Sequence, residues 1–175
     1  MRETALSHGI YATFMAKPMA AEAGSSMHIH QSLLDKHSGN NVFVGDDGKP
    51  NELFHHYIGG LQKYVPYATA LFAPNVNSYR RFAKDNSAPI NVQWGFDNRS
   101  CGLRVPYDKP QATRVENRFA GADANPYLAF AVSLACGYLG IKEKLTPSAP
   151  LETSAYDMPF DLPRNLEDAL ERLEQ

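Results

Sequence analysis

The sequence is poor in cysteine and has no long apolar run. Its two cysteines, Cys101 and Cys136, lie far apart and match no metal-ligand spacing, so we expect both to be buried, reduced thiols. No apolar stretch reaches the roughly 18 residues that a membrane span needs. The first residues, MRETALSHGIYATF, lack the apolar core of a signal peptide. These absences favour a cytoplasmic protein without a membrane partner.

A strong excess of charge is also missing. The net charge is -2 and the isoelectric point is about 6.3, so there is no bulk basic field to attract nucleic acid. Neither common glycine-rich phosphate motif, G-x-x-x-x-G-K-[ST] or G-x-G-x-x-G, occurs. The 43% hydrophobic and 21% charged residues are typical of a folded globular chain and exclude a disordered tail. A length of 175 residues corresponds to about one domain.

The order of strand-like and helix-like segments predicts an α+β fold with a mainly antiparallel sheet and flanking helices. Asn125-Pro126 opens the clearest helix, because Asn is a good N-cap and Pro suits the first helical turn. Pro66 should break or kink an earlier helix. Residues 143–163 form a proline-rich irregular segment. Strands with hairpin-like joins are expected at 11–18, 27–33, 90–96, 101–105 and 113–119, and helices at 52–72, 126–142 and 165–175.

Both chain ends look unlike those of a complete domain. The start shows no helix cap and no clear first element. The end stops inside an amphipathic helix, in which Leu166, Leu170 and Leu173 follow the i, i+4, i+7 spacing of one helix face. An apolar stripe of this kind needs a partner, so we expect a fragment or a chain that other polypeptide completes.

Two histidines alternate along an expected strand. His28 and His30 therefore point to the same face, together with Ser32. Two imidazoles on one face can bind a divalent metal or contact a phosphate; the alternative is a pair of polar histidines on a solvated face. A jelly-roll metal site also uses H-x-H, but it needs a Glu four to six residues later, and residues 33–36 do not supply one.

A carboxylate lies between two guanidinium groups on another expected strand, because Arg114, Glu116 and Arg118 alternate. This pattern fits a cross-strand salt-bridge ladder. It fits equally well a metal-binding carboxylate with arginines for an anionic substrate. Further arginines lie at loop tips and strand ends, where they are either scattered surface groups or part of one site for a multiply charged ligand: Arg80, Arg81, Arg99 and Arg104.

Taken together, five ordered segments resemble the glutamine synthetase family, with matching order and approximate spacing over residues 12–141. The segments are G-S-S-M-H-I-H-Q-S-L at 24–33, P-N-V-N-S-Y-R-R at 74–81, A-P-I-N-V-Q-W-G-F-D-N-R-S at 88–100 with L-R-V-P at 103–106, R-V-E-N-R-F at 114–119 and D-A-N-P-Y-L-A-F at 123–130. The resemblance implies that residues 1–175 are part of one catalytic domain, without the N-terminal β-grasp domain and the C-terminal end.

The resemblance also implies site residues. The metal ligands for Mg²⁺ or Mn²⁺ are His28 and Glu116. The glutamate-binding residues are Gly24, Arg81, Arg99 and Arg118. The nucleotide-binding residues are His30, Ser32, Arg99 and Arg104, and the residues at the reacting groups are Arg99 and Ser87. The segment 107–112 is one residue shorter than the family pattern, so Lys109 is only a weak candidate for its nucleotide-binding lysine.

The implied chemistry has two steps. ATP, the co-substrate, phosphorylates the γ-carboxylate of glutamate, and ammonia or a small amine then displaces phosphate. Divalent ions and arginines suit this reaction because they neutralise the transferred phosphoryl group. The resemblance further implies a ring-shaped homo-oligomer for the full-length protein.

Two departures concern the amine. The family pattern has a Glu two residues before the Pro of its A-P pair, which helps to bind ammonium and takes its proton, whereas Ser87 stands here in D-N-S-A-P. Ala23 replaces a common Asn. The run W-G-F-D-N-R, with Trp94 and Phe96, resembles the branch that joins glutamate to putrescine or polyamines. We therefore expect a γ-glutamylputrescine or γ-glutamylpolyamine synthetase. The alternatives are a true glutamine synthetase and a non-catalytic structural or regulatory member.

Overall fold

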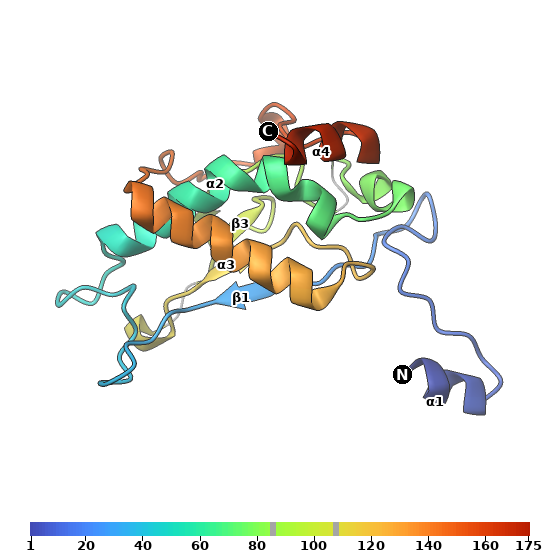
Figure 1. Cartoon of the computed structure of the whole chain (residues 1–175), viewed down its shortest axis with the longest axis horizontal. Helices are drawn as coiled ribbons and strands as arrows, with labels where there is room; N and C mark the ends of the chain where they lie inside the picture. Colours follow the sequence, from blue (N-terminus) through green and yellow to red (C-terminus); the bar gives the residue numbers. More distant parts are fainter. Residues whose placement is uncertain (85–86, 107–108) are drawn as a thin grey trace.

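A four-stranded sheet packed against two long helices forms the body of the protein in the computed structural model, which describes residues 1–84, 87–106 and 109–175 (Figure 1). The expected α+β class is confirmed. The helices are α1 (Arg2–Ser7), α2 (Glu52–Phe72), α3 (Pro126–Glu143) and α4 (Leu166–Leu173). The strands are β1 (Ile29–Gln31), β2 (Trp94–Phe96), β3 (Leu103–Val105) and β4 (Val115–Asn117), and 3-10 turns lie at Val76–Arg81, Pro110–Ala112 and Ala155–Asp157.

The sheet has the order β1-β4-β3-β2. β4 pairs antiparallel with both β1 and β3, as expected. β2 and β3 were expected to form a hairpin-like pair, but they pair in parallel, with Trp94 opposite Leu103 and Phe96 opposite Val105. The short stretch between them therefore crosses back to the start of β3 instead of making a tight turn.

Alternation along the strands separates the two faces of the sheet. Ile29, Leu103 and Val115 are buried in the core with residues of α2. The residues between them, such as Glu116 and its register partners His30 and Arg104, point to the opposite face. The apolar face thus holds the helices, and the other face collects the charged side chains.

Helix α2 follows its predicted bounds. Asn51 caps its first turn by accepting a hydrogen bond from the Phe54 backbone amide at 3.1 Å. The expected interruption at Pro66 does not end the helix, which continues to Phe72. The cost of one missing backbone hydrogen bond is offset by burial of the apolar face, where Ile58 and Val65 are fully buried.

The chain before β1 differs from the sequence-based expectation. A short helix, α1, precedes it, buries no residue and lies away from the body at the end of an extended arm (Figure 1). The expected strand at 11–18 does not form, and Tyr11 is 91% exposed. β-rich sequence becomes a strand only when a neighbour supplies a hydrogen-bonding ladder, and none of the described strands pairs with this segment.

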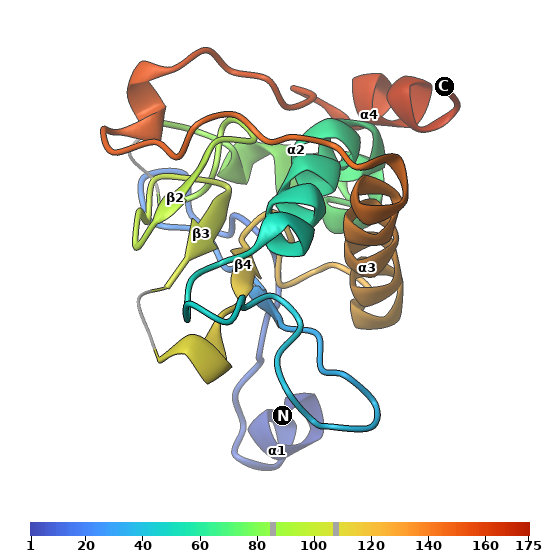
Figure 2. The same ribbon diagram turned by 90° about the vertical axis from the view of Figure 1, so that its left-hand side faces the viewer.

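The segment between α3 and α4 is irregular except for the turn Ala155–Asp157, and it runs along the β2 side of the sheet (Figure 2). Backbone hydrogen bonds join Leu151 N to Trp94 O at 2.8 Å and Asp161 N to Ile90 O at 3.0 Å. The Trp94 indole also donates to Ser148 O at 2.8 Å. These contacts hold the connecting segment 145–165 against β2 and the chain that precedes it. None of the described helices is long and apolar enough to cross a membrane.

Glycines allow α2 and α3 to lie side by side (Figure 1). A Cβ atom added to Gly60 would stand 2.2 Å from Cys136 O and 2.6 Å from Gly140 Cα. One added to Gly137 would stand 2.1 Å from the ring of Tyr57. No real Cβ atom tolerates such distances, so the separation of the two helices depends on these residues being glycine.

We expect Gly60→Ala to lower the free energy of unfolding by about 1–3 kcal/mol, the cost of overpacking a core. This would occur although Ala improves helix propensity by about 1 kcal/mol. Denaturant unfolding measures the change. Tyr67→Ala, at a position of α2 that is 44% exposed, is the control and should change stability by less than about 0.5 kcal/mol. An unchanged or more stable Gly60→Ala variant would contradict the close packing.

Candidate active site

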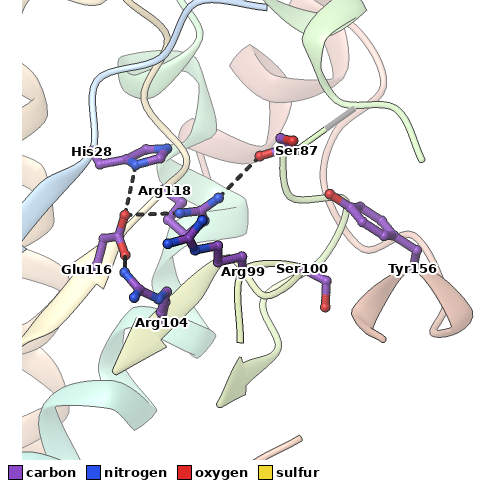
Figure 3. A pocket seen from close by; sticks show the side chains of 8 residues that line it. All are labelled: His28, Ser87, Arg99, Ser100, Arg104, Glu116, Arg118 and Tyr156. Atoms are coloured by element: carbon purple, nitrogen blue, oxygen red, sulfur yellow. Dashed lines mark hydrogen bonds and ion pairs between the residues drawn. The ribbon is translucent and has the colours of Figure 1, made fainter. Parts of the chain in front are cut away.

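The carboxylate of Glu116, on β4, is the centre of a charged cluster (Figure 3). Its Oε1 lies 2.8 Å from His28 Nδ1 and 3.0 Å from Arg118 Nη1. Its Oε2 accepts a hydrogen bond from Arg104 Nη1 at 2.7 Å. The register explains Arg104, which is directly opposite Glu116 on β3. His28 directly precedes β1, the strand on the other side of β4. His28 and Glu116 were expected to share one face on neighbouring antiparallel strands; they do face each other, but His28 lies one residue before β1.

The Glu116 side chain is only 3% exposed, and yet it is ionised. Burial alone would raise its pKa, but hydrogen bonds from His28 and Arg104 and the charge of Arg118 outweigh that effect, so the pKa lies well below its ordinary value. A permanent negative charge is therefore held at the sheet surface by three cationic or hydrogen-bonding partners.

A cleft of about 580 Å³ opens beside this cluster. That volume is within the range of small-molecule sites. Six residues that the sequence singled out line it: His28, Ser87, Arg99, Arg104, Glu116 and Arg118. The structure adds two that sequence reasoning missed, Ser100 and Tyr156. Ser100 belongs to the N-R-S run that was already recognised, whereas Tyr156 lies in the proline-rich segment, where no sequence pattern indicates a site residue.

Positive charge is in excess in this cleft. Arg104 is held by Glu116 and, through Nε, by Asp97 Oδ1 at 3.0 Å. Arg118 donates from Nη2 to Ser87 O at 3.3 Å, and its buried Nε has no hydrogen-bond partner among the described residues. The exposed guanidinium of Arg99 has no ion pair within the described part of the chain. The cleft is therefore suited to an anionic ligand, such as a carboxylate or a phosphate.

His30 and Ser32 line a second, smaller cavity of about 360 Å³, between β1 and the side chains of Phe130 and Leu134 on α3. His30 Nδ1 receives a hydrogen bond from Arg114 Nε at 3.2 Å, and its Nε2 is 4.0 Å from Glu116 Oε1. Burial lowers the pKa of His30, although Glu116 partly opposes the shift. The imidazole is thus neutral at pH 7 and borders the charged cleft.

Arg81 and Gly24 contact each other outside both cavities. The Arg81 side chain is 2% exposed and donates to Phe119 O. Burial lowers its pKa to about 10, so it still carries its charge at neutral pH. A Cβ atom on Gly24 would stand 2.8 Å from Arg81 Cγ, so glycine is needed for this contact. In this chain both residues hold a loop in place; their binding of glutamate stays a prediction.

The expected nucleotide-binding segment 107–112 is only partly described. Tyr107 and Asp108 lie outside the described residues. Lys109 is exposed at the start of the turn Pro110–Ala112 and lines neither the charged cleft nor the cavity at His30. The described part of this segment therefore adds no lining residue to either cavity.

Comparisons with known proteins identify the family. The family model for the glutamine synthetase catalytic domain matches residues 1–175. A glutamine synthetase of Pyrococcus furiosus is 42% identical over 177 residues, which cover 96% of this chain and 40% of that protein. The chain belongs to the glutamine synthetase family. The predicted resemblance is thereby confirmed.

Two further relatives show the breadth of this family. A glutamate–isopropylamine ligase of a Pseudomonas species is 42% identical over 173 residues, covering 98% of this chain and 38% of that protein. A solved structure described as "Apo GmaS without ligand" has a TM-score of 0.86 at 35% identity, covering 99% of this chain and 41% of that one. The chain spans about two fifths of the length of the curated relatives that it matches.

A divalent ion is expected in a glutamine synthetase family member, and the predicted ligands in this chain are His28 and Glu116. The carboxylate of Glu116 is the kind of ligand that Mg²⁺ and Mn²⁺ prefer, whereas the imidazole of His28 is more typical of Zn²⁺, Fe²⁺ or Ni²⁺. Glu116 already receives three contacts, which leaves about one of its four lone-pair positions. Among the described residues no group of three or more His, Cys, Asp or Glu side chains can hold a metal. His28 Nδ1 lies 2.8 Å from Glu116 and its Nε2 lies 3.1 Å from Ser26 Oγ, so an ion at His28 would replace one of these two contacts. Metal binding by His28 and Glu116 stays a prediction.

We expect Glu116→Gln to lower the free energy of unfolding at pH 7 by about 3–5 kcal/mol, because one partner of a buried ion-pair group is lost. The folded-state pKa of Glu116 is below its ordinary value of 4.5, so its stabilisation is present above that value and is lost as the pH falls through the folded-state pKa. The difference from the wild type should shrink below about pH 4.5. Denaturant unfolding at several pH values measures both effects.

Asp97→Asn is the matched control for this experiment. Asp97 also contacts Arg104, but its side chain is 47% exposed, so its loss should cost no more than about 1 kcal/mol. Equal losses for the two variants would contradict the central position of Glu116.

Proposed function

We propose that the full-length protein is an ATP-dependent ligase that joins the γ-carboxyl group of glutamate to an amine through γ-glutamyl phosphate. One observation carries this proposal: a chain of the glutamine synthetase family brings Arg99, Arg104 and Arg118 together with His28 and Glu116 at one cleft. Both substrates of the first step are anions, and the excess positive charge of the cleft suits them.

The proposed roles follow from these positions. Arg104 and Arg99 neutralise phosphate oxygens during phosphoryl transfer, and Arg118 and Arg99 orient the carboxylates of glutamate. The ion pairs of Arg104 and Arg118 with Glu116 fix their guanidinium groups before substrate enters, so little reorganisation is needed during the reaction. When bound at His28 and Glu116, a divalent ion supplies further charge neutralisation to the phosphoryl group.

The amine that accepts the glutamyl group is the finer part of the proposal. Ser87 lines the cleft, and its backbone carbonyl accepts a hydrogen bond from Arg118. A neutral hydroxyl attracts an ammonium ion less than the carboxylate that the family pattern has there. We therefore propose an organic amine, such as putrescine, a polyamine or a small alkylamine. The similarity to a glutamate–isopropylamine ligase supports an acceptor of this class.

Ammonia is the second candidate, because the glutamine synthetase of Pyrococcus furiosus is as similar as the isopropylamine ligase. A non-catalytic role is the third, and the retained cluster of His28, Glu116 and three arginines argues against it. Phosphate release from ATP by the full-length protein, with glutamate and in turn ammonium, isopropylamine and putrescine, separates the three. The highest kcat/KM with an organic amine supports the proposal. A preference for ammonium overturns the proposed organic acceptor. No turnover with any amine overturns the ligase function itself.

Restoring a carboxylate should move the preference towards ammonium. In the full-length enzyme, Ser87→Glu adds a negative charge that attracts a small cation and can accept its proton. One such contact in a partly shielded cleft is worth on the order of 1–4 kcal/mol, so the ratio of kcat/KM for ammonium to that for putrescine should rise about tenfold or more. Ser87→Ala is the control, since it removes the hydroxyl without adding charge. A ratio that Ser87→Glu leaves unchanged would show that position 87 does not face the amine.

The 175-residue chain alone should not turn over ATP. Its described residues offer two metal ligands, His28 and Glu116, and no larger cluster, which is too few to bind the divalent ions of a phosphoryl-transfer site. Glutamate-dependent phosphate release by this polypeptide, measured beside the full-length protein as positive control, would contradict the expectation.

A further inference from the structure

Tyr156 connects two parts of the charged cleft that come from distant parts of the sequence. It lies in the 3-10 turn Ala155–Asp157 and lines the cleft together with Ser87 and Ser100 (Figure 3). Its hydroxyl donates a hydrogen bond to the backbone carbonyl of Ala88 at 3.2 Å. Ala88 directly follows Ser87, so the tyrosine holds the backbone next to the residue at which we place the amine.

The turn that carries Tyr156 is itself firmly attached. The backbone amide of Ala155 donates to Ser100 Oγ at 2.8 Å, and its carbonyl accepts from the buried Asn91 side chain at 2.7 Å. Asn98 donates to Thr153 O at 2.8 Å and accepts a hydrogen bond from Ser100 Oγ at 2.6 Å. Ala155 is completely buried. The turn is therefore fixed to the loop that contains Arg99.

The Ser87 backbone needs such support. Ser87 has a φ of 58°, in the left-handed region that residues other than Gly, Asn and Asp seldom occupy. Its own carbonyl accepts the 3.3 Å hydrogen bond from Arg118 Nη2, which is long. The hydrogen bond from Tyr156 to the next carbonyl adds a second support from another element. Without that hydrogen bond, only the contact with Arg118 and the packing of the buried Ala88 would stabilise the backbone conformation of Ser87.

We propose that Tyr156 is a positioning residue for the amine acceptor: it sets the distance between the Ser87 backbone and the Arg99 loop, and thereby the width of the cleft where the amine enters. The proposal rests on the proposed ligase function. Tyr156 acts on the backbone of Ala88 and Ser87 first, and reaches the glutamate-binding Arg118 only through its long hydrogen bond to Ser87 O. Loss of its hydroxyl therefore changes the binding of the amine most. A gap set in this way discriminates between amines of different size.

The test is Tyr156→Phe in the full-length enzyme, because this change keeps the ring and removes the hydroxyl that donates to Ala88. The KM of the preferred amine should rise about three- to tenfold, the effect of one lost hydrogen bond. The KM values of ATP and glutamate should change less than that of the amine, and the melting temperature should stay that of the wild type. Tyr138→Phe, on an exposed tyrosine of α3 outside the cleft, is the matched control and should leave all of these values unchanged.

The possible outcomes separate the two proposals. An amine KM that equals the wild-type value, or an equal rise of all three KM values with a lower melting temperature, overturns the positioning role and leaves the ligase function in place. A wild-type enzyme that turns over ATP with none of the amines removes the ligase function, and this inference with it. A selective rise of the amine KM, which disappears when the tyrosine is restored, supports the positioning role.

Discussion

The site depends on one buried charge, the carboxylate of Glu116. A carboxylate that is 3% exposed would be neutral if it stood alone, since burial disfavours the charged form. It stays ionised because His28, Arg104 and Arg118 surround it. The dependence is mutual, as the two guanidinium groups would repel each other at this spacing without the carboxylate between them. β1, β3 and the chain after β4 are thus tied together by the same group that prepares the cleft for anions.

The described strands are only three residues long, but they are enough to place this group. Because side chains alternate, burying Val115 and Asn117 against the helices turns Glu116 to the opposite face. The tight packing at Gly60 and Gly137 holds α2 and α3 as one layer beneath the sheet. A displacement of that layer would shift β4, so residues far from the cleft contribute to its geometry through packing alone.

Periodicity and short sequence motifs predicted those structural features that neighbouring residues determine. The bounds of α2, the cap of α3 at Asn125 and the face that Glu116 shares with Arg118 follow from periodicity or from motifs within a few residues. The meeting of His28 with Glu116 was implied by the family resemblance, because it depends on the pairing of two distant segments. The parallel pairing of β2 with β3, the absence of a strand at 11–18 and the presence of Tyr156 at the cleft depend on which segments meet in space. Short strands carry no register information of that kind, and the position of Tyr156 is set by the side chains of Asn91, Asn98 and Ser100.

The charge of the cleft also bears on the choice of amine. Alkylamines, with a pKa near the value of about 10.4 that lysine has, arrive as cations at neutral pH, and Arg99, Arg104 and Arg118 repel them. An ammonium ion has no apolar part, so it depends on hydrogen bonds and on a nearby negative charge, and Ser87 does not provide that charge. A carbon chain changes this balance, because each buried methylene contributes about 0.8 kcal/mol regardless of charge. A neutral residue at position 87 is therefore compatible with an acceptor that binds through its carbon atoms.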